Sequence, residues 1–506
     1  MAQPLTPINL VSPAFKGINT EDSPLAQDTA FAEIADNAVI DKRGQLAARK
    51  GVSVLTTDAT ALGSDYISQV FYFEDSAGNT EVFSAGNNKI FSGTTTLVDV
   101  TPAAYTITAN NWKIVNFNDS CYFFQRGHEP LVYSNTLGAV TPMSSVPSAS
   151  VTSAQYGNEV LAAYGRLWVT DNSTNATVIY WSDLLIGSDF SGGSSGSIDI
   201  TKVWPEGADK IKALATFNDF LVIFGEQSIV VYSGASSPAN MALADTVAGV
   251  GCVCRNSVQN IGTDILFMSQ SGLRGFTRTI QEKSMPLTDL SRNIKQELIQ
   301  QLLNRTGPTH SVYSPENYFY LITFSDTNIT YCFDLRGQLE NGSYRVTRWI
   351  SCPFVCYDRK DDGTVYIGSE YGIGTYFGYS DNNLAFPFRY ASPSLTFGDS
   401  SRLKILKKLR PVLINGAGYR VGIKWSYDFG EAVRTAFIDI DAQYPAYFNE
   451  GEFNVAEFTK GTALSKINVN TTGDGSVVTV GLEAQINGQP LSIQEFNVLA
   501  LIGKTV

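Results

Sequence analysis

The sequence predicts an all-β protein: a six- or seven-bladed β-propeller with an N-terminal docking segment and a C-terminal antiparallel β-sandwich. Three observations support this prediction. Short apolar segments alternate with turns rich in Gly, Asn, Asp and Ser along most of the chain. A strand motif recurs every 40–54 residues in the first three quarters of the sequence. Beyond about residue 386 the repeat stops, and alternating strands continue without it.

The repeat consists of a polar or Gly turn followed by a short strand and, in several copies, a second strand after a tight turn. A spacing of 40–54 residues matches one four-stranded propeller blade, whereas strands of a sandwich series recur more closely and without such a long period. One of the seven copies can belong to a shared closing blade, so the prediction covers six or seven blades. The copies begin at Asn79, Asp119, Gly165, Asp219, Asp264, Asn317 and Gly363.

Composition excludes several classes of protein. The 506 residues include 36 Lys and Arg against 48 Asp and Glu, a net charge of −12, and the sequence pI is about 4.8. Apolar residues reach 43%, which is too many for a disordered chain at this net charge. The acidic pI argues against a basic nucleic-acid reader, and 43 Gly and 19 Pro argue against a coiled coil.

Cysteine and histidine residues are too few and too poorly spaced to indicate a metal site or a catalytic site. Cys252 and Cys254 are separated by one residue, shorter than the usual spacing in a zinc site, and the two His form no ligand pair. The six Cys are therefore expected to be buried free thiols, and no cofactor or metal is expected. With two His in the chain, a catalytic triad is not expected either, and the protein is predicted not to be an enzyme.

No targeting or membrane signal is visible. The sequence contains no run near the roughly 18 apolar residues of a membrane span. Its first residues lack the basic and apolar regions of a secretory signal. The chain is therefore expected to be made in a cytosol, with no membrane span.

One helix is predicted over about residues 288–304. Apolar residues there lie on one helical face, Thr288 or Asp289 can cap its start, and Gly307-Pro308 ends it. A packing helix on the outside of the β body is the favoured interpretation.

Changes in the strand pattern divide the chain into a docking segment (1–60), a propeller (61–385) and a sandwich (386–506). The first 60 residues have too little strand pattern for a core of their own, so we expect them to pack on other domains or on a neighbouring subunit. Residues 401–410 carry five positive charges among apolar residues. That basic segment is either an exposed strand whose charges prevent edge pairing or meet acidic neighbours, or a patch for phosphates. The candidate docking residues are Arg43, Arg49, Lys50, Arg402, Lys404, Lys407, Lys408 and Arg410.

The order of several motifs resembles a known family. Gly17-Ile-Asn-Thr20 is followed by Asn37, Gly44-Gln-Leu46 and Arg49-Lys-Gly51. The blade motif Phe217–Ser233 follows, and then Val250-Gly251, Gly272-Leu-Arg-Gly-Phe276 and Met285-Pro-Leu-Thr288. This series is similar to the tail nozzle proteins of short-tailed bacteriophages, also called tail tubular protein B or packaged DNA stabilization proteins. The resemblance is scattered over residues 1–380 and is weaker beyond.

The resemblance implies a structural virion protein, made in the host cytoplasm. As a homohexamer in a portal–adaptor–nozzle complex, it would contact the phage adaptor, and a tail fibre or needle protein is a further candidate partner. It would hold packaged DNA in and pass it at ejection, with transient non-specific contact between the genome and the lumen. An acidic wall suits sliding DNA, because each neutralised phosphate would tighten binding. The family brings no catalytic residues.

Two other functions remain open from the sequence. A receptor- or glycan-binding propeller of the virion could stack sugars on aromatic residues such as Tyr318, Phe319 and Tyr320. A propeller hydrolase would need a pair of carboxylates, but no spacing in the sequence singles out such a pair.

Overall fold

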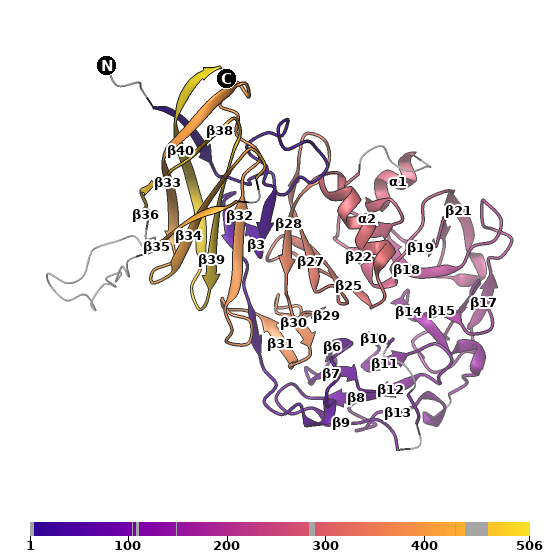
Figure 1. Ribbon diagram of the computed structural model, residues 1–506. Helices are drawn as coiled ribbons and strands as arrows, with labels where there is room; N and C mark the ends of the chain where they lie inside the picture. The colour runs from indigo at the N-terminus through magenta and orange to yellow at the C-terminus, as the bar shows by residue number, and fades with distance from the viewer. Residues whose placement is uncertain are drawn as a thin grey trace.

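The computed structural model describes residues 5–103, 105–107, 111–147, 149–282, 289–430, 432–440 and 464–505. It forms two parts, a ring of radial β-sheets and a sandwich of two larger sheets (Figure 1). The marked chain ends both lie at the sandwich end of the molecule in that view.

Six blades of the propeller have four antiparallel strands each within the described residues. They are β6 (Gln69–Glu74), β7 (Thr80–Gly86), β8 (Lys89–Ser92) and β9 (Val98–Asp99); β10 (Lys113–Phe117), β11 (Ser120–Phe124), β12 (Leu131–Tyr133) and β13 (Thr141–Pro142); β14 (Gly157–Ala163), β15 (Arg166–Asn172), β16 (Val178–Trp181) and β17 (Gly196–Asp199); β18 (Ile211–Phe217), β19 (Phe220–Gly225), β20 (Ile229–Ser233) and β21 (Ala242–Val247); β25 (Thr309–Ser314), β26 (Phe319–Phe324), β27 (Ile329–Gln338) and β28 (Tyr344–Ile350); and β29 (Cys356–Arg359), β30 (Val365–Ser369) and β31 (Gly372–Tyr376) with β5 (Val52–Val54).

The first strands of these blades surround the axis of the ring, and β29, β6, β10, β14 and β18 contact one another in that order. A three-stranded sheet, β22 (Gln259–Asn260), β23 (Ile265–Ser269) and β24 (Gly272–Gly275), fills the sector between β18–β21 and β25–β28. The propeller prediction is confirmed. Each of the seven sequence motifs coincides with the second strand of one of these sheets, because a tight turn and a buried strand recur there in every sheet.

The ring is closed by a strand from far away in the sequence. β5 pairs antiparallel with β31, matching Val52 to Tyr376 and Val54 to Gly374. The closing blade therefore combines three strands from the end of the repeat with one from the beginning of the chain. This pairing holds the ring together without a covalent link.

Two α-helices, α1 (Phe276–Glu282) and α2 (Lys295–Asn304), lie beside the three-stranded sheet within the described residues. The helix prediction was correct for the second half of its range, where Leu298 and Leu302 are buried. Its start was wrong. Thr288 lies outside the described residues, and the carboxylate of Asp289 accepts hydrogen bonds from the backbone N–H and hydroxyl of Ser291, which fixes a turn before the helix. The 3₁₀ turns are η1 (Thr60–Leu62), η2 (Met143–Ser145), η3 (Ser153–Gln155), η4 (Pro238–Asn240), η5 (Arg255–Ser257) and η6 (Arg292–Ile294).

The sandwich consists of two sheets that share one core. One contains β32 (Phe386–Ala391), β39 (Val478–Ile486), β34 (Arg420–Tyr427) and β35 (Arg434–Asp439). The other contains β1 (Thr6–Val11), β3 (Ala38–Ile40), β4 (Leu46–Ala48), β40 (Leu491–Thr505), β33 (Arg402–Asn415), β36 (Leu464–Lys466), β37 (Val469–Asn470) and β38 (Asp474–Gly475). Alternate residues of the two sheets meet in this core, among them Leu406, Val421, Leu482 and Phe496.

The propeller and the sandwich are joined by one continuous sheet. β2 (Ile34–Asp36) pairs in parallel with β28 of a blade and antiparallel with β32 of the sandwich, so the sheet has nine described strands. Residues 1–60 thus supply strands to both sandwich sheets and to the closing blade. The core that runs across this junction makes the two parts one packed unit.

Candidate functional site

The basic segment predicted as a docking site forms the first two thirds of β33. This strand pairs with β40 on one side and with β36, β37 and β38 on the other, so it is an interior strand and the edge-strand explanation is wrong. Arg402, Lys407 and Arg410 are exposed and Lys408 is half-buried. Arg402 lies 3.2 Å from a carboxylate oxygen of Asp399.

Lys404 is the exception in this segment, because it is fully buried. Its ammonium donates hydrogen bonds to the backbone carbonyls of Asp399 and Ser476, the latter at 2.7 Å. It therefore ties the start of β33 to the loop before β39 and is not available to a partner.

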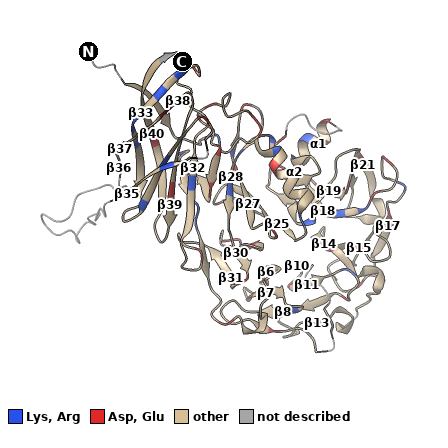
Figure 2. Ribbon diagram, viewed as in Figure 1, with Lys and Arg blue, Asp and Glu red and all other residues tan. Residues whose placement is uncertain are grey.

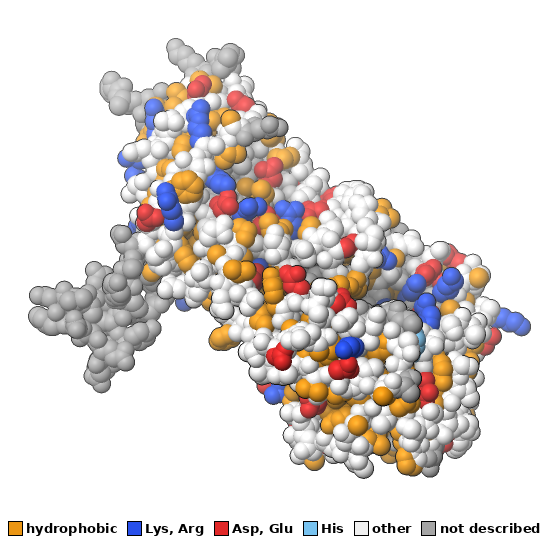
Figure 3. All heavy atoms as spheres, turned by 60° about the horizontal axis from the view of Figure 1, so that its bottom comes forward, with side chains coloured by type: hydrophobic (Ala, Val, Ile, Leu, Met, Phe, Trp, Pro, Cys, Tyr) orange, Lys and Arg blue, Asp and Glu red, His pale blue; other side chains and the backbone are white. Residues whose placement is uncertain are grey.

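Three charges of this strand have no ion-pair partner in the part of the chain that the structure describes. Among the described residues, no carboxylate lies within 4.0 Å of the charged groups of Lys407, Lys408 or Arg410. Their cross-strand partners on the same face are neutral, with Lys408 opposite Leu499 and Arg410 opposite Asn497. We call Lys407, Lys408 and Arg410 the basic face. Figure 2 marks the positions of Lys and Arg in blue along the strands of the sandwich, and Figure 3 shows Lys and Arg side chains on its surface.

The charge of the chain is divided unevenly. Residues 386–506 contain 12 Lys and Arg against 11 Asp and Glu, whereas residues 1–385 contain 24 against 37. The net charges are therefore +1 and −13. Among the described residues, the basic face is a positive surface without carboxylate partners on a chain whose first 385 residues are strongly acidic, so it favours an acidic partner.

The N-terminal docking candidates separate into different environments. Arg43 is exposed in the turn between β3 and β4, and Lys50 is half-buried beside the ring of Tyr376. Arg49 is completely buried and binds both oxygens of Asp381, at 2.9 and 2.6 Å. Arg49 is therefore a structural residue at the junction, and the structure does not bring these three residues together with the basic face.

A second candidate lies on the propeller axis, where a cavity of about 510 Å³ is lined by residues at the beginnings of the first strands. Glu159 is buried beside it, 3.7 Å from the ammonium of Lys113 and 3.8 Å from the guanidinium of Arg255. Burial, with help from Arg255 and Lys113, lowers the pKa of His310 to about 3, so this imidazole is neutral at physiological pH. Oε1 of Glu159 accepts a hydrogen bond from the backbone N–H of Leu214, whereas its Oε2 accepts none among the described residues. The cluster is a set of buried ion pairs around the axis.

Asp358 on β29 is the group near the axis that titrates in the physiological range. Burial raises its pKa to about 7, although the backbone N–H of Tyr72 donates a hydrogen bond of 2.5 Å to it. The folded protein therefore binds more protons than the unfolded chain between about pH 4 and 7, and its stability falls as pH rises through that window, by at most about 1.4 kcal/mol per pH unit.

We expect Asp358→Asn to remove this dependence of stability on pH, because Asn cannot ionise and keeps a hydrogen-bond acceptor. The measurement is the free energy of urea unfolding of both proteins from pH 5 to 8. Equal slopes in the two proteins would contradict the assignment.

The six cysteines lie in the interior of the protein. All six are free and buried, and burial raises the pKa of Cys252 to about 12. Within the described residues, no group of three or more Cys, His, Asp or Glu is placed to bind a metal ion. No helix in the same part of the chain is long and apolar enough to span a membrane.

Comparison with known proteins identifies no family. No family model matches the sequence, and no curated protein matches it either. The extracellular domain of a hybrid two-component system from B. thetaiotaomicron is similar in structure, with a TM-score of 0.44 at 11% identity over 67% of this chain and 41% of that one. The C-terminal WD40 domain of Sif2 gives 0.38 at 11% over 68% and 98%, and the WD40 propeller domain of Doa1 gives 0.36 at 12% over 64% and 95%.

The present chain thus spans about two fifths of the first of these structures and nearly all of the two WD40 domains. By their descriptions, one is an extracellular domain of a two-component system and two are WD40 domains, and none identifies a phage family. The propeller assignment is established by the strand order of this chain itself.

Proposed function

We propose that this protein is a structural subunit of the nozzle of a short phage tail. Six copies form a tube that docks on the adaptor, holds packaged DNA and passes it at ejection. The proposal is based on the order of the family motifs in the sequence, and one structural observation supports it. The basic face, which no described carboxylate pairs with, lies on a sandwich that is joined to an acidic propeller through one continuous sheet.

The continuous sheet matters because a subunit of a pressurised conduit has to transmit load without hinging. A ring of six identical subunits needs two different patches on each subunit. The basic face supplies one patch, and it is matched by an acidic surface on its neighbour. The strongly acidic propeller half leaves DNA phosphates few cations to hold, which suits a genome that has to slide.

The test is charge reversal of the basic face in the full-length protein. We expect K407E/K408E/R410E to lower incorporation into tail particles at least about tenfold, since three attractive contacts become repulsive. The urea midpoint should stay close to that of the wild type, because exposed charges contribute little to stability. Copy number per particle is measured by mass spectrometry, with six expected for the wild type.

The matched control is K202E/K210E, which reverses two exposed charges on the propeller and should leave incorporation unchanged. Normal incorporation of the triple variant would contradict the role of the basic face. A wild-type protein that never enters particles would contradict the nozzle function itself.

A further inference from the structure

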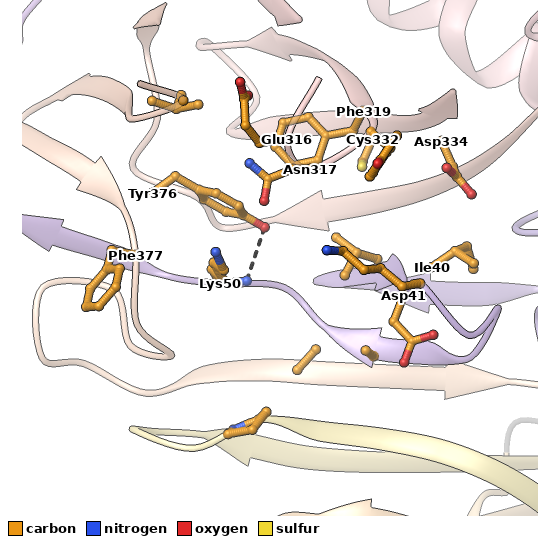
Figure 4. A pocket seen from close by; sticks show the side chains of 18 of the residues that line it. Ile40, Asp41, Lys50, Glu316, Asn317, Phe319, Cys332, Asp334, Tyr376 and Phe377 are labelled. Atoms are coloured by element: carbon orange, nitrogen blue, oxygen red, sulfur yellow. Dashed lines mark hydrogen bonds between the residues drawn. The ribbon is translucent and has the colours of Figure 1, made fainter. Parts of the chain in front are cut away.

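A pocket of about 850 Å³ lies where the propeller meets the sandwich. Its walls come from the β3–β4 hairpin, the blade β25–β28, the closing blade and the beginning of β40. This volume is within the range of small-molecule sites and holds two or three sugar rings. Figure 4 shows Lys50, Tyr376 and Phe377 on one side and Glu316, Asn317 and Phe319 on another.

Two aromatic side chains of this pocket are open to solvent. Phe377 is 67% exposed and Tyr318 is 46% exposed, whereas the next residues of the same aromatic run, Phe319 and Tyr320, are 4% and 0% exposed. One face of the Tyr318 ring is covered by the guanidinium of Arg336, at 5.5 Å. The backbone N–H of Phe377 donates a 3.1 Å hydrogen bond to the carbonyl of Gly51, which fixes the backbone from which the aromatic ring extends. Both aromatic rings are exposed apolar surfaces, and the hydrogen bond fixes the backbone of Phe377.

The charges around the pocket are of both signs, and three of its four acidic residues form ion pairs. The fourth, Asp41, has no basic group within 4.0 Å among the described residues, and its Oδ1 accepts hydrogen bonds from the backbone N–H groups of Arg43 and Gln45. Glu316, Asp334 and Asp362 each have a basic partner, at 3.3 Å from Arg359, 2.9 Å from Arg345 and 3.0 Å from Lys360 respectively. In contrast, no described carboxylate lies within 4.0 Å of the ammonium of Lys42 or Lys50. A ligand thus meets three carboxylates that are paired with basic side chains, one that is held by backbone N–H groups, and two ammonium donors without a carboxylate partner.

Exposed aromatic rings, carboxylates and two ammonium groups in one pocket favour one class of ligand. Sugar rings present C–H groups that pack on aromatic faces, and their hydroxyls donate to carboxylates and accept from ammonium groups. A nucleic acid would bring many phosphates toward Glu316, Asp334 and Asp362, and an acidic peptide would bring a carboxylate on nearly every residue toward the same groups, so both meet like-charge repulsion. We propose that the pocket binds an oligosaccharide that carries a carboxylate, such as one containing uronic acid, with Tyr318 and Phe377 as stacking surfaces. Lys42 and Lys50 hold the carboxylate.

The site does not depend on the nozzle function, and it can be tested on the purified full-length protein by calorimetry. The probe is a tetrasaccharide of alternating glucuronate and N-acetylglucosamine. Neutral tetra-N-acetylglucosamine, hexaglutamate and a six-nucleotide oligothymidylate serve as comparisons. We expect the acidic tetrasaccharide to bind at least about tenfold more tightly than each of these.

Variants then assign the contacts. Phe377→Ala should weaken tetrasaccharide binding at least about tenfold, and K42A/K50A should abolish the preference over the neutral sugar. Phe429→Ala is the matched control, since this ring is 61% exposed on the sandwich outside the pocket, and it should bind normally. Urea midpoints verify that each variant is folded. Absence of tetrasaccharide binding, equal binding by Phe377→Ala, or tighter binding of hexaglutamate or oligothymidylate would overturn the proposal.

Discussion

Replacing Arg49 by methionine is expected to lower the free energy of unfolding by about 3–5 kcal/mol. The guanidinium is completely buried, and besides Asp381 it bonds Asn37 at 3.0 Å and lies 4.0 Å from the ring centre of Phe386. Methionine fills a similar volume but leaves the carboxylate of Asp381 buried without a counter-charge. The measurement is equilibrium unfolding in urea.

Two further variants make this expectation specific. R49M/D381N should recover part of the loss, because it removes the stranded charge together with its partner. Arg43→Met, in the exposed turn of the same hairpin, should change stability by less than about 0.5 kcal/mol. A loss in R49M that is no larger than in Arg43→Met would show that the buried pair does not stabilise the junction.

The second large effect is expected from a charge introduced into β5, the strand that closes the ring. Val52 is 1% exposed and packs in the core of the closing blade. We expect Val52→Asp to destabilise the protein by about 3–5 kcal/mol, since a carboxylate would be buried there without a partner. Limited proteolysis should then cut the closing blade first, because β5 can no longer hold it.

The neighbouring Ser53 provides the control. It lies on the same strand but is exposed, so Ser53→Asp should change stability by less than about 0.5 kcal/mol. If Val52→Asp is as stable and as resistant to protease as Ser53→Asp, β5 does not close the ring.

The propeller was predictable because its signal is local and repeated. Each motif combines a turn with a strand, and the turn residues Asn118, Asp119, Asn218 and Asp219 adopt the left-handed backbone that such turns require. Helix α2 was detected by its apolar face. Helix α1, with the sequence Phe-Thr-Arg-Thr-Ile-Gln-Glu, was missed, because it is short and contains residues of low helix propensity.

The pairings between distant segments could not be predicted. A three-residue strand such as β5 has no pattern that identifies its partner, and the sheet that joins the two parts depends on β2, which is equally short. Arg49 was assigned to a docking surface from its charge alone. Its burial depends on Asp381, which is 332 residues away. In the basic segment, the alternation indicated a strand but not that it lies inside a sheet.

The pocket at the junction was missed for the same reason. The aromatic run at Tyr318 was visible in the sequence, but Lys42 and Phe377 reach the same space from distant segments. No local signal links these residues.

The strand that closes the ring also determines when the molecule can finish folding. β5 is synthesised early, yet β31 ends 322 residues after Val54. At 5–20 residues per second, the ribosome needs roughly 15–65 s to supply that partner. During this interval Val52 and Val54 have no sheet to join, and an unpaired strand with apolar side chains invites association with other nascent chains. Production of the native protein is therefore expected to benefit from chaperones and from a low concentration of nascent chains, and the closing blade forms last.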